Sequence, residues 1–234
     1  MSNLNINPQD SAVTDLDTAF KPDCAQMRQT PVQADAGQAP RAESPLYHAD
    51  LASIAAKGPL EGGVQLQELS FLGHLVIRGS LDNPAFVDGF AQAMGFALPG
   101  KLASVEQGDA SVRWIAPDEW LLVVPGNEAF ELEGRLRELM AGHFSIVNVS
   151  GGQTILQLSG PDAVKVLKKS TGYDLHDRNF PVGKVVTTTF AKTQAVIRRL
   201  DVQQWELVIR RSFADYVWLW LQDASAEYGL VVRG

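Results

Sequence analysis

Residues suited to acid–base chemistry gather in one polar stretch of the chain, Tyr173–Arg178. His176 lies there between Asp174 and Asp177, and a carboxylate beside a histidine can orient the ring as a general base. The same stretch has the polar composition of a solvated surface loop, which the sequence favours over a site. We therefore expect a loop here, with a histidine-based catalytic site as the alternative.

The other residue types that bind metals or cofactors do not form recognisable motifs. His48, His74, His143 and His176 are scattered without the pairing of a zinc site, and Cys24 is the only cysteine. No glycine-rich phosphate-binding loop and no nucleophile elbow occurs. The sequence therefore predicts no catalytic, cofactor-binding or metal-binding residue in this chain.

Four arginines in the C-terminal part could bind anions instead. Arg198–Arg199 and Arg210–Arg211 form a basic cluster in a predicted hairpin, and a guanidinium can hold a carboxylate or phosphate through two hydrogen bonds. In an acidic chain two uses compete, namely ion pairs within the sheet and salt bridges to another protein. Arg210 and Arg211 are our candidates for partner contacts.

The last predicted helix carries two apolar residues, Trp218 and Leu219, that a helical wheel places outside its core face. An exposed tryptophan is unusual on a monomer and common at protein interfaces. Trp218 is therefore predicted to contact a partner, or alternatively to cover a loop of its own chain. The predicted core face consists of Val217, Trp220, Leu221 and Ala224.

Composition restricts the location and the partners of the protein. The net charge of −7 and the pI of about 5.1 argue against nucleic acid or an anionic membrane surface as a main partner. The first residues lack the basic and apolar regions of a signal peptide, and no apolar run is long enough to span a bilayer. A single cysteine suits a reducing compartment. We expect a cytoplasmic protein.

The chain divides into two parts by composition. Residues 1–43 are rich in Gln, Asp, Ala, Pro and Asn without sustained periodicity, so they cannot bury enough apolar surface to offset their ordering entropy. We expect a disordered tail over 1–43 and a folded domain over 44–234. The fold should begin with a short helix at Ser44–Leu46, where Ser44 suits the N-cap and Pro45 the first helical position.

The folded part repeats one β-α-β-β-α unit, over about 64–145 and 146–234. Gly79 and Gly160 each end a strand before a helix with an early proline, and Trp120 and Trp205 each open the second strand of a hairpin. Each unit should pack its helices on one face of a small antiparallel sheet. The predicted fold class is therefore α+β, built of two pseudo-repeats.

Seven short motifs, individually weak and specific together, are spread over residues 44–234. In these motifs the chain resembles the gamma subunit of heterotetrameric sarcosine oxidase. The motifs are Ser44–Leu46, Leu69–Gly73, Leu75–Gly79, Trp114–Leu122, Val149–Thr154, Leu158–Asp162 and Arg211–Tyr216.

This resemblance implies a fold similar to the folate-binding domain of the glycine cleavage T-protein. It also implies a complex that oxidatively demethylates sarcosine to glycine, with hydrogen peroxide and either formaldehyde or methylene-tetrahydrofolate as further products. In that family the flavins FAD and FMN belong to the beta subunit, NAD and the tetrahydrofolate site to the alpha subunit, and zinc to the delta subunit. The gamma subunit is thus expected to be a non-catalytic assembly subunit without a cofactor.

One departure bears on folate chemistry. Folate-using relatives of the T-protein carry paired acids in a G-G-x-x-D-D type segment, whereas Gly151–Gly152 is followed here by Gln153–Ile155, and Asn148 stands where an acid is expected. The fold can thus persist without the folate chemistry. The alternative function is a stand-alone folate-binding protein or one-carbon transferase.

Overall fold

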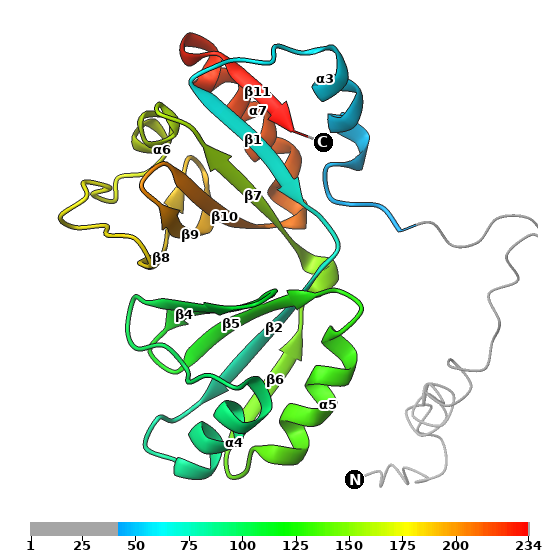
Figure 1. The fold of residues 1–234 in the computed structure, drawn as a ribbon, viewed down its shortest axis with the longest axis vertical. Coiled ribbons are helices and arrows are strands. Elements are labelled where there is room, and N and C mark those ends of the chain that lie inside the picture. The colour runs from blue at the N-terminus through cyan, green and yellow to red at the C-terminus, as the bar shows by residue number, and fades with distance from the viewer. Residues whose placement is uncertain (1–41, 234) are drawn as a thin grey trace, which may run out of the picture. The chain divides into compact units, whose positions relative to one another are not determined.

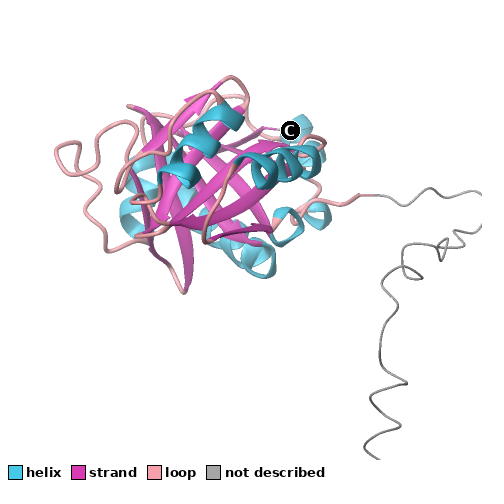
Figure 2. Ribbon diagram, turned by 90° about the horizontal axis from the view of Figure 1, so that it is seen from below, coloured by secondary structure: helices cyan, strands magenta, loops and turns pink. Residues whose placement is uncertain are grey.

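The computed structural model describes residues 42–233, and Glu43–Gly234 form one compact unit. The predicted tail, 1–43, therefore lies almost wholly outside the described residues. Within the compact unit two β-sheets stack face to face (Figure 1), and helices lie on the outside of the strands (Figure 2). This is the predicted α+β class, with two sheets that each take most of their strands from one half of the chain.

The first sheet has five strands in the order β3-β4-β5-β2-β6, all antiparallel. Two helices cover its outer face, and Asn83 caps the first of them by accepting a hydrogen bond from Ala85 N at 3.2 Å, with Pro84 at the first helical position. The elements are β2 (Leu72–Gly79), α4 (Pro84–Met94), β3 (Ser104–Gln107), β4 (Ala110–Ala116), β5 (Glu119–Pro125), α5 (Ala129–Leu139) and β6 (Phe144–Asn148).

The second sheet has six strands in the order β11-β1-β7-β10-β9-β8, and two further helices cover it. α7 is 12 residues long, and none of the helices in residues 42–233 is long and apolar enough to cross a membrane. The elements are β1 (Val64–Leu69), β7 (Gln153–Ser159), α6 (Ala163–Ser170), β8 (Val185–Phe190), β9 (Thr193–Asp201), β10 (Gln204–Arg210), α7 (Ala214–Ser225) and β11 (Leu230–Arg233).

Strand register supports the internal repeat. Trp120 of β5 lies opposite Ile77 of β2, and Trp205 of β10 lies opposite Leu158 of β7. Ile77 and Leu158 each stand two residues before the glycine that ends its strand. Both tryptophans are fully buried beneath the helices of their own sheet. The two units therefore match in pairing as well as in element order.

The two strand-ending glycines make the same hydrogen bond. Gly79 N donates to Asp118 O at 3.1 Å, and Gly160 N donates to Gln203 O at 3.0 Å. Each acceptor stands two residues before the buried tryptophan of its unit. A Cβ at Gly79 would lie 2.7 Å from the Phe86 ring, so glycine is required where the helix passes close to the strand end.

The sheets divide the chain differently from the predicted boundaries at 64 and 145. β1 belongs to the six-stranded sheet, and β6 belongs to the five-stranded one. β1 and β6 occupy equivalent places, since β6 pairs antiparallel with β2 and β1 pairs antiparallel with β7. Because β1 lies beside β7, β11 lies at the edge of the sheet and pairs in parallel with β1. The second sheet is mixed for this reason, and not purely antiparallel as expected.

Three apolar clusters hold the layers together. One lies between α4, α5 and the five-stranded sheet, and another between α6, α7 and the six-stranded sheet. The third lies between the two sheets and is small. Its buried members are Leu121, Val123, Ile155 and Val208.

Short backbone contacts join the two sheets at one edge. Ala103, just before β3, forms an antiparallel bridge with Lys184, just before β8. Ser104 N donates to Gly183 O at 3.0 Å, and Val185 N donates to Leu102 O at 3.0 Å. We call residues 102–104 and 183–185 the seam.

The start of the fold differs from its prediction in the capping residue. The helix α3 (Leu51–Lys57) is capped by Asp50, whose Oδ1 accepts a hydrogen bond from Ser53 N at 3.3 Å. Ser44 instead donates its hydroxyl to Glu68 Oε2 at 2.7 Å. A single 3-10 turn, η1 (Tyr47–Ala49), lies between the two residues.

The repeated tryptophans allow a matched stability test. Trp120 Nε1 donates to Pro99 O at 2.9 Å, whereas the buried Trp205 Nε1 has no hydrogen-bond partner among the described residues. Trp120→Phe and Trp205→Phe should both lower the free energy of unfolding in urea. The loss should be about 1–3 kcal/mol larger for Trp120→Phe, because it leaves a buried carbonyl without its donor. An equal or larger loss for Trp205→Phe would contradict this assignment.

Candidate functional site

The His176 loop is built as an ordered turn, not as a catalytic pair. Asp174 accepts hydrogen bonds from His176 N at 2.9 Å and from the Asn179 side chain, and these bonds lower the pKa of its carboxyl group. The His176 ring accepts a hydrogen bond from Arg178 N at 3.2 Å through Nδ1. Neither neighbouring aspartate reaches that ring, so the structure supports the surface-loop interpretation of this stretch.

The other histidines lie apart from one another. His48 contacts Asp215 at 2.8 Å on the surface, His143 is exposed, and His74 is buried with its Nδ1 2.9 Å from Gln153 Oε1. Within residues 42–233 no three His, Cys, Asp or Glu side chains are grouped so that they could hold a metal ion. Cys24 lies outside the described residues.

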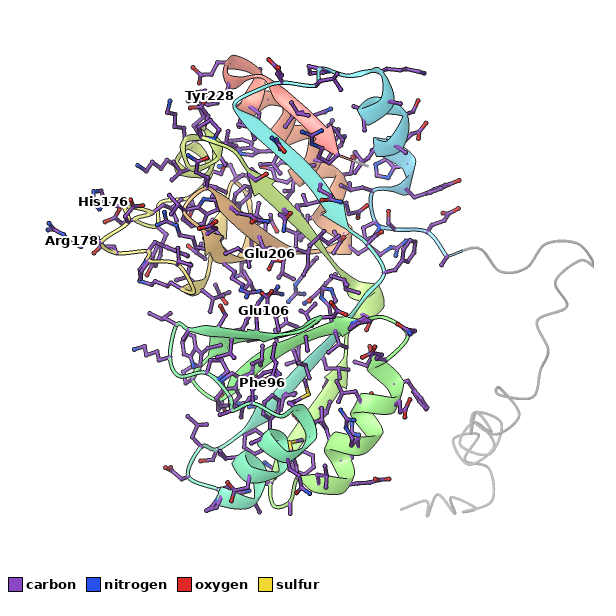
Figure 3. All side chains as sticks on the ribbon, in the orientation of Figure 1. Phe96, Glu106, His176, Arg178, Glu206 and Tyr228 are labelled. Atoms are coloured by element: carbon purple, nitrogen blue, oxygen red, sulfur yellow. The ribbon has the colours of Figure 1, made fainter. Side chains whose placement is uncertain are left out.

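Buried charges converge between the two sheets around the carboxylate of Glu206. Arg113 of β4 donates to it from the five-stranded sheet, and Arg198 of β9 lies 3.4 Å from it in the six-stranded sheet. Arg198 also contacts Glu106 at 2.5 Å and Ser104 Oγ at 3.0 Å. Figure 3 shows Glu206 on the upper sheet and Glu106 on the lower one. We call Glu106, Arg113, Arg198 and Glu206 the inter-sheet ion cluster.

Arg113 is the most deeply buried charge of this cluster. Its side chain is 1% exposed, and its Nε and Nη1 have no hydrogen-bond partner among the described residues. Burial lowers the pKa of Arg113 to about 10, against the attraction of Glu206. The guanidinium therefore stays charged at neutral pH and depends on Glu206 for compensation.

Arg199 faces away from the ion cluster because successive residues of a strand point to opposite faces. It stacks 4.9 Å from the Trp205 ring, donates to Phe180 O at 2.7 Å and pairs with Asp177 at 2.8 Å. Of the two predicted uses, the Arg198–Arg199 pair therefore serves ion pairs within this chain. Arg113, Glu106 and Glu206 were missed, although Arg113 and Glu206 each stand between apolar residues of a strand, where a charge needs a partner.

The prediction that Trp218 points outward is wrong. Its side chain is 3% exposed and belongs to the core beneath α7. Asp215, one turn earlier, contacts His48 of η1 at the surface. Trp218 is thus used within its own chain, as a core residue and not as the cover of a loop that the alternative predicted. Leu219 is 55% exposed, as expected.

Arg210 and Arg211 lie at the surface where β10 meets α7. Arg211 donates to Glu43 O at 3.4 Å, and no ion pair with a described residue holds either side chain. They and Leu219 stay candidates for partner contacts, and Trp218 does not.

A cavity of about 970 Å³ opens beside the seam, between the loop that precedes β3 and the loop that joins α6 to β8. Lys101 contributes from the first loop, and Tyr173, Asp174, Arg178 and Lys184 from the second. Both halves of the chain thus form its walls. A more polar cavity of about 610 Å³ lies next to it and reaches the inter-sheet ion cluster.

Similarity to known proteins covers most of this fold. The sequence model of the family described as sarcosine oxidase, gamma subunit, matches residues 78–227. The chain belongs to this family. It is 35% identical over 189 residues to the sarcosine oxidase subunit gamma of Corynebacterium sp. (strain P-1), covering 79% of this chain and 90% of the relative. It is also 35% identical over 192 residues to that of an Arthrobacter species, with the same coverage.

Solved structures agree with this assignment. A chain of the heterotetrameric sarcosine oxidase from Corynebacterium sp. U-96 matches with a TM-score of 0.72 and 30% identity, covering 80% of this chain and 95% of that one. The glycine cleavage system aminomethyltransferase T from Bartonella henselae matches with a TM-score of 0.59 and 16% identity, covering 82% of this chain and 58% of that one. The second likeness concerns the fold alone, and it confirms the predicted T-protein-like architecture.

Glu206 should be far more important to stability than the arginine it compensates. Glu206→Gln leaves Arg113 buried without an anion and should lower the free energy of unfolding by about 3–5 kcal/mol. Arg113→Met keeps the Arg198–Glu206 pair and removes unpartnered donors, so its effect should stay within about 1 kcal/mol of zero. Glu106→Gln is the matched control, because its half-exposed carboxylate should contribute less than about 1 kcal/mol. Urea denaturation at neutral pH measures all three, and a Glu206→Gln loss no larger than the control would contradict the assignment.

His74 should make the fold sensitive to acid. Burial lowers its pKa from 6.5 to about 4, against the hydrogen bond with Gln153. Between these values the unfolded chain binds the proton and the folded chain does not, so stability is complete above pH 6.5 and falls towards pH 4. Over this range the native chain should lose about 3 kcal/mol more than His74→Gln. Parallel curves of unfolding free energy against pH would refute this role.

Proposed function

We propose that this chain is a non-catalytic assembly subunit of a heterotetrameric sarcosine oxidase. The observation that carries the proposal is the match to a chain of such a complex over 95% of that chain's length. The residues that could have formed a catalytic pair support it as well, since Asp174 and Asp177 are engaged by a loop backbone and by Arg199. The complex would oxidise sarcosine to glycine in the cytoplasm as part of one-carbon metabolism.

The partners in this proposal are alpha, beta and delta subunits. They would carry the cofactors expected for the whole enzyme, namely FAD, FMN, NAD, tetrahydrofolate and zinc. The candidate contact residues of this chain are Leu219, Arg210 and Arg211, which are exposed around the start and the outer face of α7. The chain's own contribution would be to hold the partner chains in place.

Co-expression with the partner chains tests the proposal. The chain should copurify with a tagged flavin-binding subunit, and the complex should form hydrogen peroxide when sarcosine is added. The isolated chain should form none and should show no flavin absorbance. Peroxide formation by the isolated chain would refute the non-catalytic role, and micromolar binding of tetrahydrofolate in calorimetry would favour a folate-binding protein instead.

A further inference from the structure

The cavity beside the seam has walls of fixed geometry. At the seam beside it, Ser104 N donates to Gly183 O and Val185 N donates to Leu102 O, and these two hydrogen bonds fix the two walls relative to each other. Leu102 has a φ of 59° and Gly183 a φ of 85°, so both residues adopt the left-handed backbone conformation. A non-glycine residue in this region costs on the order of 1 kcal/mol, which the seam contacts must offset.

The charge of this cavity opposes that of the whole chain. Three cations line it, Lys101, Arg178 and Lys184, against the single carboxylate of Asp174, in a protein of net charge −7. Asp174 accepts hydrogen bonds from the His176 backbone and the Asn179 side chain and forms no ion pair with the three cations, so the charged side chains of the lining sum to about +2. Lys101 and Arg178 form no side-chain hydrogen bond or ion pair with any residue in 42–233. This cavity, which we call the groove, therefore keeps these two cations without partners at the surface.

Lys184 is the third cation, and contacts with its own loop hold its ammonium group in place. Its ammonium group donates to Asn179 O and lies 5.3 Å from the Tyr173 ring centroid and 5.6 Å from that of Phe180. Such contacts fix the position of a lysine while leaving further donors available. Arg178 projects from its loop into solvent (Figure 3), and Lys101 belongs to the other loop that lines the cavity.

We propose that this groove docks an acidic segment of a partner subunit, whose carboxylates pair with Lys101, Arg178 and Lys184. The inference rests on the proposed function. Cations from two separate loops fit several carboxylates along an extended chain better than one small anion. Complementary charge of this kind selects a partner and speeds its association.

Charge reversal in the complete complex tests the groove. The double variant Lys101→Glu/Arg178→Glu should weaken retention of this chain by a tagged partner subunit at least about tenfold, and the difference should shrink as salt rises. Lys57→Glu/Lys192→Glu is the matched control, because it changes the net charge equally at exposed residues outside the groove. In the native complex, a zero-length carbodiimide reagent should link Lys101 to an aspartate or glutamate of a partner chain.

The outcomes separate the two proposals. If the native chain does not copurify with the partner subunits, the proposed function itself fails. If it copurifies and the groove variant is retained like the control, the acidic-segment inference fails alone. If inorganic phosphate raises the melting temperature of the native chain but not of the groove variant, and assembly is unchanged, the groove is a small-anion site and the inference is overturned.

Discussion

The carboxylate of Glu206 is the group on which the stacking of the two sheets depends. It lies between Arg113 of one sheet and Arg198 of the other. Transferring an ion from water into the layer between the sheets costs several kcal/mol. The cost of burying these charges is offset only when opposite charges face one another. Any other alignment of the two sheets would leave a buried charge unpaired, so the cluster acts mainly by destabilising the other alignments. The small apolar cluster between the sheets provides attraction without such directionality.

The sequence predicted the helices, and the strands that pair with a neighbour close by in the chain. The periodicity of α4 to α7 and the apolar runs of β4, β5, β9 and β10 are visible in the sequence, and the matching glycines and tryptophans revealed the repeat. β3, β6 and β11 have only four or five residues, too few for a period to be read. The predicted unit of about 64–145 includes β1, which pairs instead with β7 and β11 of the other half, and nothing local in the sequence specifies such distant pairing.

The same limit explains the candidate site. A helical wheel assumes one narrow buried side, but α7 buries Trp218 together with Val217 and Leu221, so its buried side is wider than the wheel predicts. Adjacent arginines in β9 must point to opposite faces of a strand, yet only the structure shows that Arg198 is the one that faces the other sheet. Lys101 and Lys184 had no sequence signal, because they meet only through the seam.

The buried ions and the surface groove are linked through β3 and β9. Ser104 accepts a hydrogen bond from Arg198 and binds Gly183 O through its own N–H and hydroxyl, so one residue connects the ion cluster to the seam. A change in the stacking of the sheets would therefore move the loop of Lys101 relative to the loop of Arg178. The candidate catalytic residues of this chain are engaged in structural contacts, so the ion cluster and the seam serve the surface and not a reaction. They hold surface charges from two distant segments at the fixed spacing that recognition of another protein requires.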